Sequence, residues 1–226
     1  MWNVSRSSCV RSIFVFLLAA VGGSSGRAQI TSNPTLDRQL SRIDLGILGS
    51  GALNKDSHGT AIVNGQPTQV NLHSGNTVGP LITVRYIKSP LLGVEFNYGY
   101  ARYTDTFTPY GAQPTVGVQQ NAAEYTLGYV AHFPRPVFGV NPFVAVGAGT
   151  MDFRPTSGGG NQLLPQARAT YYYSIGAEAN VLSPHFGLRA QFRQAFFKAP
   201  DFETNFLTIQ QHTSTLEPGI GFFLRF

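Results

Sequence analysis

The sequence predicts an all-β fold, namely an eight-stranded antiparallel up-and-down transmembrane β-barrel preceded by a cleavable signal peptide. Three observations predict it. Apolar residues alternate with small, polar or charged residues in eight segments, long and short connections alternate between those segments, and the charges lie on one face of the strands. Side chains of a strand point alternately to opposite faces, so this pattern describes a closed sheet with an apolar outside.

The first predicted strand covers residues 42–49 and alternates through Ile43, Leu45 and Ile47. No helical period continues beyond the N-terminal apolar run, and seven more strand-like segments follow before the chain ends. The other predicted strands are residues 77–87, 92–103, 121–133, 141–151, 169–181, 186–192 and 215–226. Only for residues 141–151 does the sequence not indicate which side chains face inward, because both faces there are apolar or small.

The connections support an up-and-down order. Four are long and polar, and three are short and contain proline. The long ones are residues 53–76, 105–120, 152–168 and 194–211, and the short ones are 88–91, 134–140 and 182–185. Eight strands joined in this way have four loops at one end, and three turns and both termini at the other. Bacterial outer-membrane barrels have short periplasmic turns and longer extracellular loops.

Charged residues lie opposite the apolar stripe, five acids and four arginines in all: Asp44, Arg85, Glu95, Glu124, Glu178, Arg189, Arg193, Glu217 and Arg225. Arg102 is the exception, near the loop end of its strand. A lipid-facing Arg or Lys costs about 2–4 kcal/mol at mid-membrane. The interior of an eight-stranded barrel is just wide enough for side chains to fill, and buried charges must pair. We therefore expect a structural charge network and no large pore.

Two further residue types fit a barrel in a bilayer. Glycines on the inward faces are expected to make room for the arginines: Gly79, Gly93, Gly99, Gly128, Gly176, Gly187 and Gly221. Tyrosines near the strand ends are expected to form aromatic girdles at the membrane interfaces: Tyr98, Tyr100, Tyr103, Tyr125, Tyr129, Tyr171 and Tyr173.

The N-terminus has the features of a secretory signal. Arg6 and Arg11 precede an apolar run at residues 13–21, and small residues lead to a cleavage site after Ala28. The run is shorter than the roughly 20 residues of a spanning helix. The predicted organisation is a signal peptide at 1–28, a short periplasmic lead at 29–41, either disordered or tucked under the barrel, and the barrel at 42–226.

Composition excludes several functions. The net charge of +5 falls to +2 once three arginines leave with the signal, and no basic cluster indicates nucleic-acid binding. The only cysteine, Cys9, lies in the signal, so no disulfide is expected. The histidines lack metal-ligand spacing, and the glycine-rich residues 157–161 lack the Lys of a phosphate-binding loop. No cofactor or metal is predicted.

With its signal, its eight strands and the run at residues 182–193, the chain resembles the OmpA-type outer-membrane β-barrel domain family of Gram-negative bacteria. The resemblance implies an outer-membrane location, contact with outer-membrane lipids and lipopolysaccharide, and a C-terminal assembly signal at Phe222, Leu224 and Phe226 that the barrel-assembly machinery reads. Because no peptidoglycan-binding domain follows Phe226 in this sequence, tethering to the cell wall through such a domain is not expected.

The function predicted from these features is a structural or surface-interaction role, in which four long loops bind an unknown extracellular ligand and no enzyme activity is expected. The alternative is a lipid-modifying hydrolase, resembling a lipid A deacylase, that uses His212 and Ser214 with Glu217 nearby. Glu217 has the opposite parity, however, and the pair lies at a loop end. A soluble lipocalin-like binder conflicts with the inward charges and with Phe226.

Overall fold

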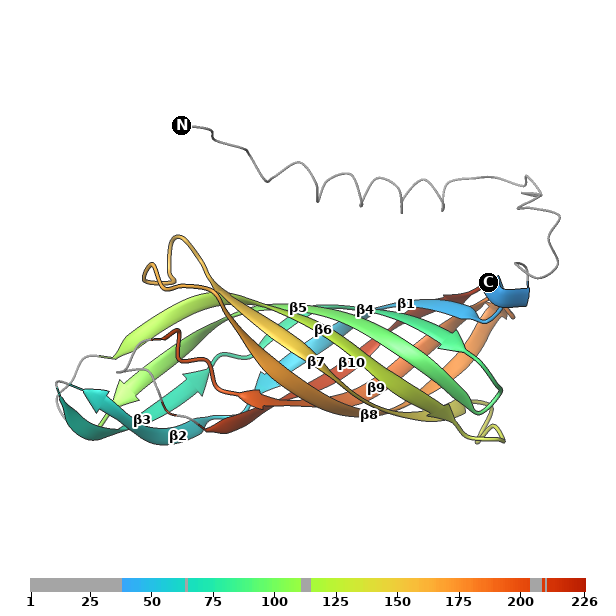
Figure 1. Cartoon of the computed structure of the whole chain (residues 1–226). Helices are drawn as coiled ribbons and strands as arrows, with labels where there is room; N and C mark the ends of the chain where they lie inside the picture. Colours follow the sequence, from blue (N-terminus) through green and yellow to red (C-terminus); the bar gives the residue numbers. More distant parts are fainter. Residues whose placement is uncertain (1–37, 64, 111–114, 204–208, 210) are drawn as a thin grey trace, which may run out of the picture. The chain divides into compact units, whose positions relative to one another are not determined.

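The computed structural model describes residues 38–63, 65–110, 115–203, 209 and 211–226, and these form an almost entirely β structure (Figure 1). Eight strands form the barrel: β1 (Ile43–Asn54), β4 (Thr77–Ile87), β5 (Leu92–Pro109), β6 (Val116–His132), β7 (Asn141–Pro155), β8 (Gln166–Ser183), β9 (Phe186–Lys198) and β10 (His212–Arg225). Each is antiparallel to its neighbours, and β10 pairs with β1 to close the barrel. The predicted antiparallel barrel of eight strands is confirmed, and the predicted signal peptide lies outside the described residues.

The predicted loop at residues 53–76 is wrong in part, because most of it is a β-hairpin. Strand β2 (Ser57–Val63) pairs with β3 (Gln66–Ser74), and β3 pairs with the loop end of β5 from Val70↔Pro109 to Ser74↔Asp105 (Figure 1). In β3 only Val70 and Leu72 alternate as apolar residues, and both are buried. So short an alternation among polar residues gives a weak strand signal in the sequence.

Several barrel strands also run further toward the loop end than the sequence predicts. Strand β1 ends at Asn54, β5 at Pro109 and β9 at Lys198, while β6 begins at Val116. Beyond the bilayer the outward positions become polar, so the apolar alternation that marks a strand fades although pairing continues. The facing of β7 is now settled: Phe143 and Ala145 are buried inside, and Val144 and Val146 are exposed outside.

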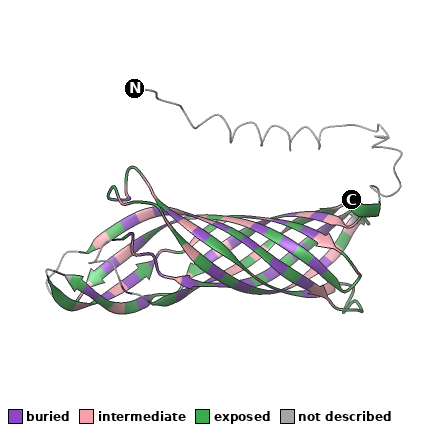
Figure 2. Ribbon diagram, viewed as in Figure 1, coloured by how far each residue is buried: buried purple, intermediate pink, exposed green. Residues whose placement is uncertain are grey.

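Burial alternates along every barrel strand (Figure 2). Large apolar side chains are the exposed ones, among them Val78, which is 76% exposed, Ile220 at 68% and Leu127 at 60%. Arg85, Arg189 and Arg193 are at most 1% exposed. This distribution is the reverse of a soluble protein and matches a barrel whose outside faces lipid. Tyr103 corrects the girdle prediction, because it is buried in the interior.

Two features complete the ends of the barrel. At the turn end, Phe138 and Gly139 form a two-residue turn between Val137 and Val140, with φ of 52° and 82°. At the loop end, apolar residues from strands and loops pack into one cluster: Ala61, Val70, Leu72, Tyr103, Phe107, Val118, Ala122, Met151, Phe153, Phe197, Ala199, Phe202 and Ile209. The loop end is therefore a packed extension of the barrel.

Candidate functional site: the interior charge network

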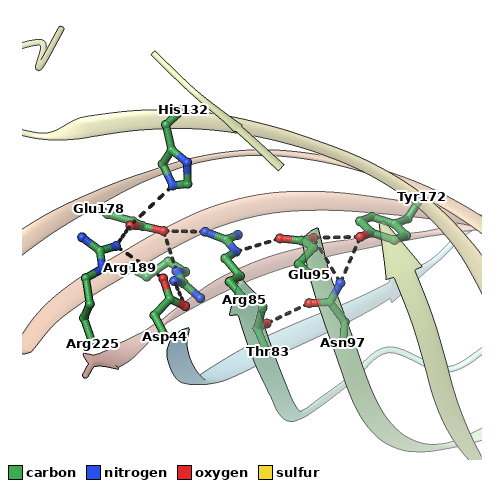
Figure 3. A network of polar contacts seen from close by, with 10 residues as sticks. All are labelled: Asp44, Thr83, Arg85, Glu95, Asn97, His132, Tyr172, Glu178, Arg189 and Arg225. Atoms are coloured by element: carbon green, nitrogen blue, oxygen red, sulfur yellow. Dashed lines mark hydrogen bonds and ion pairs between the residues drawn. The ribbon is translucent and has the colours of Figure 1, made fainter. Parts of the chain in front are cut away.

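The turn half of the interior holds a cluster of three acids and three arginines (Figure 3). Arg85 lies at its centre, with Nε donating to Glu95 at 2.7 Å and Nη1 donating to Glu178 at 2.5 Å. These partners come from three strands, β4, β5 and β8. Arg85 and Glu95 are directly opposed in the register of β4 and β5, which brings their side chains to one face.

Glu178 is the acid shared by all three arginines. Arg189 donates to it from Nε at 3.0 Å and to Asp44 from Nη2 at 2.9 Å. Arg225, 32% exposed at the turn end, reaches Glu178 at 3.3 Å and Asp44 at 3.4 Å. With Arg85 included, the turn-half cluster is balanced in charge. His132, whose ring Nε2 lies 3.8 Å from Glu178, closes it toward the turns.

A second cluster, nearer the loops, has more acid than base. Arg193 pairs with both Glu124 and Glu217, and no other cation joins these two carboxylates in the described part of the chain. Tyr172 connects the two clusters, because its hydroxyl donates to Glu95 at 2.8 Å and its ring lies 4.2 Å from the guanidinium carbon of Arg193. The loop-half cluster therefore carries one formal negative charge in excess.

Glycines make room for the network in an unexpected way. A Cβ on Gly128 would lie 2.3 Å from the Tyr172 hydroxyl. On Gly176 it would lie 2.4 Å from the Phe143 ring, and on Gly187 the same distance from Phe223. Each ring in turn lies beside an arginine, as Phe143 does 4.1 Å below Arg85. These glycines leave space for aromatic rings, and the rings stabilise the arginines by cation–π contact.

All nine inward-facing charged residues named from the sequence lie in these two clusters. Sequence reasoning missed Asn97, Tyr172 and His132, which share the inward parity of their strands. Asn97 donates to Glu95 at 3.1 Å and to the Tyr172 hydroxyl at 3.0 Å. Their inward parity was the signal that could have identified them, but the predicted network included charged residues only.

The arrangement offers little for catalysis. Every acid in the two clusters accepts from an arginine, and the described residues hold no group of three or more His, Cys, Asp or Glu placed to bind a metal. Among the described residues, no helix is long and apolar enough to cross a membrane. An interior in which every acid is paired with an arginine supports the packing and charge balance of the barrel.

The residues of the hydrolase alternative are not brought together. His212 is exposed at the loop end of β10, and the Ser214 hydroxyl lies 3.2 Å from Gln194 Nε2. Glu217 lies on the opposite face of the strand and pairs with Arg193. A serine nucleophile needs a histidine and an orienting acid within hydrogen-bond reach, and here the acid is directed to the interior.

The three C-terminal residues of the predicted assembly signal lie on the lipid face. Phe222 is 55% exposed, Leu224 39% and Phe226 56%. Phe222 stacks on Phe186 of the neighbouring strand with ring centroids 5.5 Å apart. The apolar residues therefore form one outward stripe at the turn end of β10.

Comparison with known proteins identifies a family whose model matches most of the chain. The model of the outer membrane protein beta-barrel domain matches residues 15–222. Among solved structures, the outer membrane protein OprG from Pseudomonas aeruginosa has 13% sequence identity and a TM-score of 0.57, covering 81% of this chain and 95% of that one. Neisserial surface protein A has 14% identity and a TM-score of 0.44, covering 80% and 97%. A search of curated proteins finds no match.

Proposed function

This chain belongs to the outer membrane protein β-barrel domain family, and on that premise we propose that it is a structural or surface-interaction protein of the bacterial outer membrane. In this proposal the barrel is a closed anchor, and the long loops carry the interaction with an extracellular ligand. The observation that carries the proposal is the filled interior, in which three arginines are at most 1% exposed and each pairs with two carboxylates.

The filled interior argues against a pore. A continuous water channel would leave the buried guanidiniums hydrated. Instead, the turn-half cluster joins β1 and β4 to β8 and β9, and the loop-half cluster joins β9 to β6 and β10. The apolar cluster at the loop end adds a second layer, in which Phe107 and Phe153 are at most 1% exposed. Two layers of different chemistry, one charged and one apolar, therefore occupy the interior.

The loop end supports an interaction surface. The β2–β3 hairpin extends the sheet beyond the barrel, and loop residues 199–203 are fastened to β8. Gln166 donates to Asp201 at 2.7 Å, and Arg168 pairs with the same carboxylate at 2.9 Å. An ordered surface loses less conformational entropy on binding than flexible loops do. Binding is therefore expected to depend on this extension.

Conductance tests the closed anchor. The purified protein, folded in detergent and inserted into planar bilayers, should give no steady conductance beyond that of the lipid. Sustained channels of uniform size in a protein that migrates as a folded band would contradict the proposal. A channel-forming protein inserted into the same bilayers is the positive control for detecting conductance.

The N-terminal and C-terminal predictions belong to the same proposal. We infer cleavage after Ala28, a periplasmic lead at 29–41, and recognition of Phe222, Leu224 and Phe226 by the assembly machinery. Of the lead, residues 38–41 fall within the described structure and the rest lies outside it. Intact mass of the protein from outer membranes tests the cleavage, since a mass that retains residues 1–28 would refute it. Slow membrane insertion of Phe226→Ala in cells, with normal refolding in detergent, would support the assembly role.

A further inference from the structure

Arg102 is the one charge that the sequence places on the lipid-facing stripe, and in the structure it has a companion. Arg102 of β5 is directly opposed to Asn121 of β6, and Asn121 is directly opposed to Arg154 of β7. The three form one row across the adjacent strands β5, β6 and β7, in the loop halves of these strands. Both arginines are exposed on the outside of the barrel, and the Arg154 side chain is 65% exposed.

The two guanidiniums can reach a common ligand. Directly opposed residues lie about 4.5–5.5 Å apart, so the two arginine backbones are roughly 10 Å from each other with Asn121 between them. Arginine side chains are long enough to span half of that distance from each side. The row is therefore a cationic site on the outer wall, in which two guanidinium groups can contact one ligand.

Much of its hydrogen-bonding capacity is unused. Within the described residues, Arg102 gives one bond from Nη2 to Gln119 at 2.8 Å, and Arg154 gives one from Nε to Asp152 at 2.6 Å. A guanidinium has five N–H donors, so most remain available. Asn121 Oδ1 is buried and has no donor. Asp152 offsets one of the two positive charges, which leaves the row with one in excess.

The aromatic residues indicate the level of the row in the bilayer. Tyr98 and Tyr125 lie on the same outer face, on the turn side of the row, with ring centroids 5.2 Å apart. Tyrosines of this kind mark the membrane–water interface, and the loop end of an outer-membrane barrel faces outside. The arginines thus lie at the headgroup level of the outer leaflet, where their charge avoids the cost of the hydrocarbon core.

We propose that Arg102, Asn121 and Arg154 form a binding site for a phosphate group of lipid A, the membrane anchor of lipopolysaccharide. Planar guanidiniums bind phosphate oxygens in a bidentate manner. Because Asn121 Oδ1 is buried without a donor, the Asn121 side chain must rotate outward before this oxygen can accept an N–H or O–H of the phosphorylated amino sugar, a donor that phosphate alone lacks. This site concerns the wall of the barrel, so it is independent of what the loops bind.

Native mass spectrometry of the folded full-length mature protein tests the site, with bis-phosphorylated lipid A titrated into the detergent. The test variant is Arg102→Gln with Arg154→Gln. The matched control is Lys55→Gln with Lys198→Gln, which removes two positive charges at the same end of the barrel from β9 and from just beyond β1, each of these strands three away from β6. Unboiled gel mobility confirms that both variants fold.

The site predicts that lipid A affinity falls at least tenfold in the arginine variant and less than twofold in the lysine control. Dephosphorylated lipid A should bind wild-type protein as weakly as lipid A binds the arginine variant. Equal losses in the two variants would show general electrostatic attraction and overturn the site, as would no loss in either. Phosphatidylglycerol competing as strongly as lipid A would overturn the assignment to an amino-sugar phosphate.

Discussion

Replacing Glu178 by glutamine removes the acid on which three arginines converge. The side chain is 3% exposed and accepts from Arg85 at 2.5 Å and from Arg189 at 3.0 Å. The substitution leaves three arginines facing two acids in the turn-half cluster, and it points an amide donor at guanidiniums that need acceptors. Removing one partner of a buried ion pair costs about 3–5 kcal/mol of unfolding free energy. That is a large share of the roughly 5–15 kcal/mol of a typical protein.

Glu217→Gln is the matched control, because it makes the same chemical change in the loop-half cluster, which carries one excess negative charge, whereas the turn-half cluster is balanced. Arg193 keeps Glu124 after this substitution, and the excess negative charge disappears. The lost charged hydrogen bond and the relieved repulsion offset each other, so the expected cost is about 1 kcal/mol or less.

Urea unfolding of both variants in lipid vesicles measures the difference, with far-UV circular dichroism and the mobility of unboiled samples as two probes of folding. The reasoning predicts that Glu178→Gln is the less stable variant by at least about 2 kcal/mol. If Glu217→Gln proved as costly as Glu178→Gln, charge balance within each cluster would not govern stability, and the network would have to be treated as one unit.

Three further changes have expected outcomes. Gly221→Ala places a Cβ 2.1 Å from a backbone oxygen of β1 and should destabilise the barrel by about 1–3 kcal/mol in the same urea assay. The control is Gly117→Ala, whose added Cβ would lie 3.8 Å from its nearest neighbouring atom and should change stability by less than about 0.5 kcal/mol. Phe138→Asn should stabilise by about 1 kcal/mol, since asparagine tolerates the left-handed φ of 52° that this turn requires; no gain in the urea midpoint would refute the strain. Burial alone would raise the pKa of Asp201, but its hydrogen bonds and the ion pair with Arg168 hold the pKa below its usual 3.8. A carboxyl group whose pKa is lower in the folded than in the unfolded state stabilises the fold above the unfolded pKa, and this stability is lost as the pH falls through the folded pKa. Loop residues 199–203 should therefore become sensitive to pepsin only below about pH 3.8. Cleavage at about pH 4.5 as fast as cleavage below pH 3.8 would contradict this prediction.

Local alternation determined most of what the sequence could reveal. Because side chains of a strand alternate strictly, the parity of Glu95, Arg189 or Ile220 indicates which face each occupies once the strand is located, without knowledge of its partners. The strand count and the order of long and short connections followed from the same local pattern. The pattern weakened where outward residues become polar, which is why the β2–β3 hairpin and the loop ends of β5 and β9 were missed.

Partners across the barrel were decided by the tertiary structure alone. Arg85 meets Glu178 across 93 residues of sequence, and that contact depends on the register and stagger of all the strands between β4 and β8. No local pattern encodes that sum of registers. The same holds for the rings that fill the glycine positions and for the row of Arg102, Asn121 and Arg154. The sequence alone determined which face the side chains occupy in every predicted strand except residues 141–151, and closure of the sheet decided which side chains meet, because facing is local to one strand and contact depends on the registers of many.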